Sequence, residues 1–254
     1  MTAPFQRSPD AALLQAGECH VWWADPRDHP INTIARVLSP AEQDRAARYR
    51  REGDRHRFIT GGWLLRTAAA TYLGVSPAAV PVIRPCPRCN EPHGKPQVPH
   101  TGLHVSVSHA GDRVAVALST AGPVGVDVEA VPTTPPEELA RRALSSAERA
   151  ALADLPAHTR NAAFIRLWVC KEAALKATGH GLSIAPDQVH ISHPHTNPTL
   201  VSWPLRDTPP GDVRLHLLKP VPGYHAAVAI ITTETITIAE ITACPTGARP
   251  GPSQ

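Results

Sequence analysis

Aromatic residues and long apolar runs are both scarce in this sequence. It holds five Trp, three Tyr and three Phe, and its longest apolar stretch, residues 226–231, runs into threonines. A helix that crosses a bilayer needs roughly 18 consecutive apolar residues, so none is predicted. The first 16 residues include Arg7, Pro9 and Asp10 and lack the apolar core of a secretory signal. We therefore expect a cytoplasmic protein that makes no contact with a membrane.

Cysteine is also sparse, and neither sign of charge dominates. The five cysteines are an odd number, too few for a disulfide scaffold, and fit a reducing compartment. Lys and Arg outnumber Asp and Glu by only 25 to 22, which suits an anionic small molecule as well as a polyanion and excludes neither. The 28 prolines and 16 glycines together make up a smaller share of the residues than is typical of low-complexity chains. A globular body with proline-stiffened loops is predicted.

A weak internal repeat relates the two halves of the chain. Residues 38–42 (LSPAE) match residues 144–148 (LSSAE). In each copy a serine followed three residues later by a glutamate forms a capping box, so each segment is predicted to begin a helix. Further matches pair Phe58-Ile59 with Phe164-Ile165, Trp63 with Trp168, and Gly74 with Gly179.

Strand signals follow each helical half. Residues 104–108 and 114–119 flank one turn, and residues 213–218 and 226–231 flank another. The sequence therefore predicts an α+β (α/β) fold of two similar halves related by pseudo-twofold symmetry, each with helices packed on a small, largely antiparallel sheet. We expect the halves to span residues 1–120 and 121–244, with a single active site in the seam. Residues 245–254, rich in Pro, Gly and Ser, are expected to be a disordered tail.

Two acidic residues share one face of a predicted strand over residues 124–129. Val126 and Val128 should face the core, whereas Asp127 and Glu129 alternate with them. Carboxylates two residues apart on one strand face, about 6–7 Å between Cα atoms, repel each other unless a cation lies between them. A divalent metal is one explanation and a solvated strand face is the other. A third ligand would favour the metal.

A predicted helix over residues 168–176 supplies such a ligand. Trp168, Glu172 and Lys176 are four residues apart and form one stripe. A surface ion pair between Glu172 and Lys176 is the alternative interpretation. The matched positions of the first half hold Thr67 and Thr71, so the scaffold does not require these charges. We therefore interpret the second copy, which carries Glu172 and Lys176, as the one specialised for function.

Four motifs together resemble a known family. Residues 125–129 have the pattern G-[IV]-D-[IV]-E, and residues 168–181 have the pattern W-x-x-K-E-[AS]-x-x-K-x-x-G-x-G. Gly94-Lys95-Pro96 and residues 106–109 (SVSH) precede them in the chain. In this order the motifs resemble those of 4'-phosphopantetheinyl transferases of the double-length, pseudo-duplicated Sfp type, which activates surfactin synthetase.

That resemblance implies transfer of the 4'-phosphopantetheine arm of coenzyme A to a serine hydroxyl of an apo acyl or peptidyl carrier protein, with release of 3',5'-ADP. It implies that Mg²⁺ is bound by Asp127, Glu129 and Glu172. Glu172 is our choice for the base that takes the serine proton, directly or through water, and Asp127 has less freedom for this role. Lys176 is expected to neutralise the pyrophosphate, with Lys171 as a second cation nearby.

The resemblance also implies ligands for the nucleotide of coenzyme A. Ser108 and His109 resemble ligands of the 3'-phosphate, and Lys95 with Pro96 lies where the family approaches the adenine nucleotide. Arg57, in a stretch resembling D-x-H-R, is expected to contact the 3'-phosphate. Most of the other arginines between residues 45 and 66 are interpreted as a solvated basic face, including Arg45, Arg50 and Arg55. Trp63, Trp168 and Phe164 are interpreted as core residues.

One motif lies outside this family pattern. Cys86 and Cys89 form C-x-x-C, and His93 follows just before Gly94-Lys95-Pro96. These residues supply three ligands of a tetrahedral zinc site, whereas no second C-x-x-C follows. His100, His104 or Cys19 would have to complete the site. We expect a reduced loop with two ordinary thiols rather than structural zinc.

Two other functions remain as alternatives. A nucleic-acid-binding module could use the arginines from Arg45 to Arg66, but it leaves the strand acids unexplained. A different Mg²⁺-dependent phosphoanhydride enzyme, such as a pyrophosphatase, leaves Gly94-Lys95-Pro96 and Ser108-His109 unused. We expect no nucleic-acid partner. A monomer is expected because fused halves need no subunit interface to build the pocket.

Overall fold

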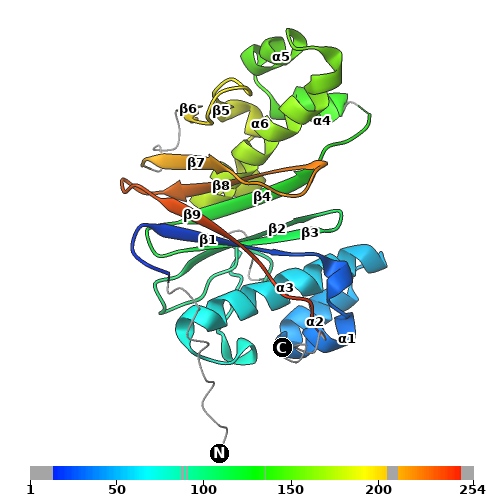
Figure 1. The fold of residues 1–254 in the computed structure, drawn as a ribbon, viewed down its shortest axis with the longest axis vertical. Helices are drawn as coiled ribbons and strands as arrows, with labels where there is room; N and C mark the ends of the chain where they lie inside the picture. The colour runs from blue at the N-terminus through cyan, green and yellow to red at the C-terminus, as the bar shows by residue number, and fades with distance from the viewer. Residues whose placement is uncertain (1–13, 87–88, 90, 135, 205–210, 247–254) are drawn as a thin grey trace, which may run out of the picture.

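The computed structural model describes residues 14–86, 89, 91–134, 136–204 and 211–246. Within them the chain forms a mixed α+β fold of four layers, helices on a sheet, a second sheet, and helices again (Figure 1). Of the expected tail over residues 245–254, residues 247–254 lie outside the described part. None of the helices within the described residues is both long and apolar enough to cross a bilayer.

The first layer pair is built from the N-terminal half and one late strand. Helices α1 (Ile31–Ile34), α2 (Pro40–Ala47) and α3 (Glu52–Leu73) lie on one face of a four-stranded sheet. Its order is β2-β3-β1-β9. Strand β9 runs parallel to β1, and the other two pairings are antiparallel. The strands are β1 (Glu18–Ala24), β2 (His104–Ala110), β3 (Arg113–Ser119) and β9 (Thr237–Thr242).

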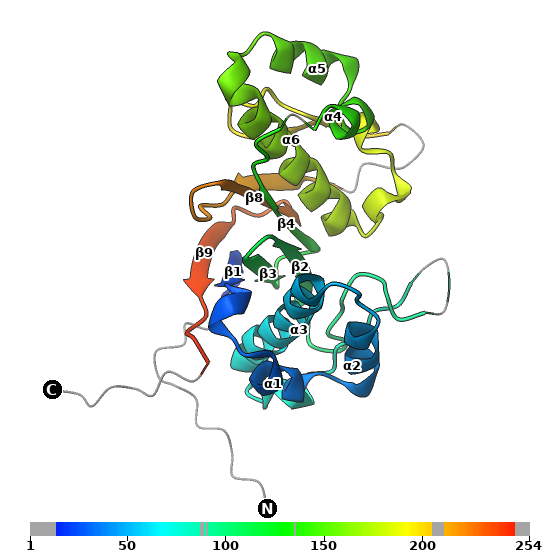
Figure 2. The same ribbon diagram turned by 90° about the vertical axis from the view of Figure 1, so that its right-hand side faces the viewer.

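The second layer pair comes from the C-terminal half. Helices α4 (Glu137–Ala143), α5 (Ser146–Ala153) and α6 (Ala157–Thr178) lie on the outer side of an antiparallel sheet of order β4-β8-β7 (Figures 1 and 2). Its strands are β4 (Val124–Ala130), β7 (Val213–Leu217) and β8 (Tyr224–Ile231). A separate hairpin pairs β5 (His190–Ile191) with β6 (Leu200–Ser202). Short 3₁₀ turns occur at Pro26–Asp28, Ala35–Val37, Pro77–Ala79, Gly181–Ser183 and Pro186–Gln188.

Both predicted capping boxes are confirmed. Ser39 caps α2 and Ser145 caps α5, each accepting from the backbone N–H of the glutamate three residues later, which accepts from the serine N–H in return. The two long helices end on Gly74 and Gly179, which adopt the left-handed conformation at φ of 67° and 79°, a region where glycine avoids a steric cost. Each capping box begins a helix of eight residues, and a separate helix of 22 residues follows.

A buried ion pair ties each short helix to its long neighbour. Glu42 Oε2 lies 2.7 Å from Arg66 Nη2 between α2 and α3, and Glu148 Oε2 lies 2.7 Å from Lys171 Nζ between α5 and α6. All four side chains are at most 8% exposed. Because an unpaired charge in such surroundings is costly, the pairs fix how the helices pack.

The two sheets pack face to face through an apolar layer. Alternate residues of β1 and β4 fill it, among them Val21, Val126 and Val128, all 0% exposed. The intervening residues of β4 face α6 instead. A Cβ on Gly125 would lie 2.0 Å from Ala173 O, so only glycine lets α6 pack so closely on this strand. Asp127 and Glu129 therefore lie on the α6 side, as the strand pattern predicts.

Candidate active site

A cavity of about 340 Å³ lies where α2, α3, β2, β4 and α6 meet. Three carboxylates line it, Asp127 and Glu129 from β4 and Glu172 from α6, together with the Lys176 ammonium. Ser108 and His109 at the end of β2 complete its polar wall. The strand and the helix that carry the predicted acids thus bring them to one cavity between the two halves.

Serine side chains on β2 hold β4 in place at this cavity. Ser106 Oγ accepts from Val126 N at 3.1 Å, and Ser108 Oγ accepts from Val128 N at 3.4 Å. The Ser108 hydroxyl donates to Asp127 Oδ1 at 2.7 Å. These bonds link the two sheets beside the acids, where β4 has no backbone partner strand on this edge.

Lys176 completes this network from α6. Its ammonium donates to Asp127 Oδ1 at 2.6 Å, to Ser108 Oγ at 3.1 Å and to Val126 O at 3.2 Å. Asp127 is 3% exposed. The cation therefore offsets part of the cost of burying this carboxylate.

The other two carboxylates are less well compensated. The pKa of Glu129 is raised to about 7, mainly by burial and then by the nearby charges of Asp127 and Glu172, while Lys176 and a hydrogen bond with Trp168 oppose the shift. Burial likewise raises the pKa of Glu172 to about 7, with Asp127 adding to the shift and Lys176 opposing it. Both carboxyls therefore bind a proton near neutral pH unless another positive charge enters the cavity.

The donor set fits a hard divalent cation such as Mg²⁺. Asp127 Oδ2 and Glu172 Oε1 are buried and have no hydrogen-bond partner among the described residues, which is costly without a ligand. The carboxylate oxygens of Asp127, Glu129 and Glu172 do not all lie within 4.8 Å of one another. Among the described Cys, His, Asp and Glu residues, only the ligand atoms of Cys86, Cys89 and His93 lie that close together. Binding one ion through all three carboxylates therefore requires side-chain rotation.

The residues predicted to bind the nucleotide differ in whether they line this cavity. His109 lines it, and burial lowers its pKa, with Lys176 and Arg57 adding to the shift. Arg57 donates to Gly111 O at 2.9 Å and pairs with Asp54. Lys95 donates to Ala177 O at 3.1 Å at the end of α6, and burial lowers its pKa to about 8.

Four predicted ligands do not line the cavity. Arg57, Lys95 and the buried Pro96 are absent from its described wall. The largest departure from the sequence interpretation concerns Lys171. It is 0% exposed, donates to Glu148 Oε2 at 2.7 Å and to Pro186 O at 2.9 Å, and points away from the carboxylates. The expectation of a second free cation at this position is wrong, because Lys171 is the structural partner of a buried glutamate.

Sequence reasoning missed several residues that line the cavity. Arg45 and Tyr49, at the end of α2, and Arg84 are part of its wall. Arg84 Nε is buried and has no hydrogen-bond partner within the part of the chain that the structure describes. The Arg45 guanidinium lies 5.2 Å from the Phe58 ring centroid and donates to Pro92 O at 3.3 Å. The run of arginines in which Arg45 lies suggested that it is exposed to solvent. Its place in the cavity wall depends on the tertiary fold.

The arginines from Arg45 to Arg66 do not form one basic face. Arg66 is buried against Glu42, Arg57 pairs with Asp54, and Arg45 lines the cavity. The aromatic residues follow the prediction more closely, since Trp63 and Phe164 are buried in the two helical cores and Trp168 is half-buried at the cavity wall.

A cavity lined by three carboxylates and by the cationic side chains of Lys176, Arg45 and Arg84 has the chemistry of a site for a phosphorylated substrate. Comparison with known proteins identifies the family. Residues 21–121 match the family "4'-phosphopantetheinyl transferase, N-terminal", and residues 123–229 match the 4'-phosphopantetheinyl transferase superfamily. The chain belongs to this superfamily and is a 4'-phosphopantetheinyl transferase.

Curated relatives agree with this assignment. The 4'-phosphopantetheinyl transferase HetI of Nostoc sp. is 33% identical over 81% of this chain and 88% of its own length. The 4'-phosphopantetheinyl transferase Sfp of Bacillus subtilis is 25% identical over 75% of this chain and 81% of its own length. The holo-[acyl-carrier-protein] synthase of Thermotoga maritima covers 43% of this chain and 62% of its own at 21% identity, with a TM-score of 0.33, an overlap too partial to define the fold.

Proposed function

We propose that this protein transfers the 4'-phosphopantetheine arm of coenzyme A to a serine hydroxyl of an apo carrier protein, with Mg²⁺ held by Asp127, Glu129 and Glu172. Family membership supports the transfer reaction. The observation that carries the assignment of the site is the meeting of three carboxylates and Lys176 in one cavity between the halves. When bound, Mg²⁺ would polarise the attacked phosphorus and neutralise charge on the leaving phosphate.

The cationic side chains of the cavity bind the phosphates of coenzyme A. Lys176 reaches the cavity from α6 and is 27% exposed, so its ammonium can meet the pyrophosphate while it stays near Asp127. Arg84 and Arg45 approach from the opposite wall. The unpaired Nε of Arg84 gains a hydrogen-bond acceptor when a phosphate oxygen enters.

Glu172 accepts the proton of the attacking serine, directly or through a water molecule. Its carboxylate lines the cavity where the serine must approach, and burial raises its pKa, which favours proton uptake. Asp127 is less suited to this role because Ser108 and Lys176 both hold its Oδ1. Lys176 lies beside the pyrophosphate and stabilises the leaving group.

The 3'-phosphate binds at the end of β2. Ser108 and His109 supply a hydroxyl and an imidazole there, and the hydrogen bond of Arg57 to Gly111 O keeps a guanidinium beside them. The adenine nucleotide approaches Lys95 and Pro96. Because burial lowers the pKa of Lys95 to about 8, a bound phosphate would strengthen its positive charge.

We also propose that the two halves are related by pseudo-twofold symmetry and meet near residue 120. The equivalent pairs Glu42 with Arg66 and Glu148 with Lys171 support this. Strand β9 belongs in sequence to the second half but pairs with β1 in the first sheet, which ties the halves together. Since one chain supplies every wall of the cavity, we propose a monomer that acts in the cytoplasm, where coenzyme A and reduced thiols coexist.

A transfer assay tests the proposal. The protein is incubated with coenzyme A, Mg²⁺ and apo acyl or peptidyl carrier proteins, and the intact carrier is weighed by mass spectrometry. We expect addition of the phosphopantetheine arm and release of 3',5'-ADP. A carrier whose modified serine is replaced by alanine is the control. Absence of transfer to several carriers, with unchanged coenzyme A, contradicts the proposal.

A further inference from the structure

Three metal-binding side chains converge in the loop between Arg84 and Gln97, outside the carboxylate site. The ligand atoms of Cys86, Cys89 and His93 all lie within 4.8 Å of one another, and Cys89 Sγ lies 3.0 Å from His93 Nε2. We infer that these residues form a zinc site that holds the loop in shape. This inference does not depend on the proposed transferase chemistry.

The ligand types select the metal. Two thiolates and one imidazole are soft or intermediate ligands that bind Zn²⁺ in preference to Mg²⁺ or Ca²⁺. Zn–S bonds of about 2.3 Å and Zn–N bonds of about 2.0–2.1 Å place tetrahedral ligand atoms about 3.5–3.8 Å apart. The observed cluster thus needs shifts of only about 1 Å to bind one ion.

The loop has little apolar core among its described residues. Its base is closed by two backbone hydrogen bonds between Ile83 and Gln97, at 3.0 and 2.9 Å. Between these residues, Pro96 is the one buried residue in the described part of the loop. A segment without a core of its own gains stability from a metal that crosslinks it. The zinc ion takes the place of an apolar core here.

The two arms of the loop approach each other directly below the cluster. Gly94 N donates to Arg84 O at 3.1 Å, and a Cβ on Gly94 would lie 1.8 Å from Pro85 O. Only glycine permits this approach, which places Cys86 on one arm next to His93 on the other. The backbone is therefore already arranged for coordination before a metal binds.

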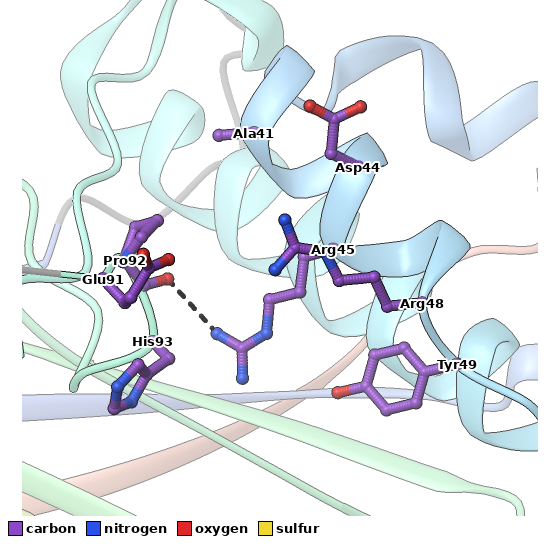
Figure 3. Close-up of a pocket in the computed structure, with 8 residues that line it drawn as sticks. All are labelled: Ala41, Asp44, Arg45, Arg48, Tyr49, Glu91, Pro92 and His93. Atoms are coloured by element: carbon purple, nitrogen blue, oxygen red, sulfur yellow. Dashed lines mark hydrogen bonds between the residues drawn. The ribbon is translucent and has the colours of Figure 1, made fainter.

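The loop also forms the wall of a second cavity, of about 600 Å³. Figure 3 shows Pro92 and His93 on one side of this cavity and Arg45 and Tyr49, from the end of α2, on the other. Arg45 and Tyr49 line the carboxylate cavity as well. The metal thereby fixes the position of Pro92 O, which accepts the hydrogen bond of Arg45.

Binding replaces two S–H bonds with two Zn–S bonds and adds one Zn–N bond to His93 Nε2. The two thiol protons pass to solvent, and no electrons are transferred. Among the described residues, His100, His104 and Cys19 do not join this group of ligand atoms. Because Cys89 and His93 are exposed, water would take the fourth position of the tetrahedron. The described residues offer three protein ligands for this ion.

Metal analysis of the untagged full chain tests the inference. The protein is purified with a thiol reductant, given Zn²⁺ and freed of excess metal by gel filtration. We expect about one zinc ion per chain, measured by mass spectrometry of the metal. Replacement of the zinc by Co²⁺ should give the thiolate charge-transfer and d–d absorption bands of a tetrahedral site.

Matched variants locate the ion. Cys89→Ser and His93→Ala should each lower zinc retention at least tenfold and abolish the Co²⁺ bands, whereas Cys244→Ser, which removes an exposed thiol elsewhere, should change neither. Glu172→Gln should also keep the zinc, which separates this site from the carboxylates. A wild-type protein without zinc, or equal retention in Cys89→Ser, Cys86→Ser and wild type, would overturn the inference.

Discussion

Lys176 Nζ lies 2.6 Å from Asp127 Oδ1, joining α6 to β4 across 49 residues of sequence. The contact neutralises one of the three carboxylates that line the cavity, whereas the buried Asp127 Oδ2 has no partner among the residues that the structure describes. A divalent cation and Lys176 can therefore share this carboxylate, one on each oxygen.

Asp127→Asn should lower Mg²⁺-dependent transfer by at least about 10²-fold, because it removes a ligand charge from the centre of the network. The amide oxygen can still accept from Ser108 and Lys176, so the thermal midpoint should stay within a few degrees of wild type. Transfer to an apo carrier and calorimetry measure the two effects. Glu234→Gln, at an exposed acid, serves as the control. Activity close to wild type in Asp127→Asn would refute its role.

Glu172→Gln preserves the shape of the side chain and removes its basicity. We expect kcat to fall by about 10²-fold or more because the serine proton loses its acceptor. Isothermal titration of coenzyme A in the presence of Mg²⁺ separates this effect from substrate binding. A variant that loses only coenzyme A affinity and keeps kcat would assign the base to another residue.

Lys171→Met should destabilise the protein by about 3–5 kcal/mol, because it leaves Glu148 buried without its cation. Urea unfolding measures this free energy. The KM for coenzyme A should not change, since Lys171 lies away from the cavity. The double variant with Glu148→Gln should lose less than the two single variants combined. Arg142→Met, which removes an exposed partner of Glu138, should cost at most about 1 kcal/mol.

Stability should depend on the protonation of His29. This residue is 0% exposed, its ring lies 4.3 Å from that of Trp63, and its buried Nε2 has no hydrogen-bond partner in the described segments. Burial lowers the pKa of His29 below its ordinary value of 6.5, and neighbouring Asp28 and Asp25 oppose this shift only in part. The unfolded chain therefore binds a proton below pH 6.5 that the folded chain excludes, so stability falls as the pH decreases through this range.

Urea unfolding at about pH 7.5 and about pH 5.5 measures the effect. His29→Phe should reduce the loss of stability between the two conditions, whereas His158→Phe, at an exposed histidine, should leave it unchanged. An identical pH dependence in wild type and His29→Phe would show that this histidine does not contribute.

Local patterns in the sequence determined much of the secondary structure. Each capping box depends on residues three positions apart, and each helix C-terminus depends on one glycine, so Ser39, Ser145, Gly74 and Gly179 are readable without tertiary information. The alternation of residues 124–129 likewise predicted which side chains face the core. The family motifs likewise singled out Asp127, Glu129 and Glu172, because each motif has a fixed spacing of residues along the chain.

Only the tertiary structure decided what each charge faces. Lys171 and Lys176 both lie on α6, yet packing on α5 turns Lys171 toward Glu148, while packing on β4 turns Lys176 toward Asp127. Arg45 reaches the cavity through contacts with residues distant in sequence. Cys86 meets His93 because the loop that carries both residues closes on itself. The sequence determined which residues form helices, strands and motifs, because those choices depend on local steric and hydrogen-bonding preferences. The fold decided which of the charged residues meet, because burial and pairing depend on elements that come together only after the chain has packed.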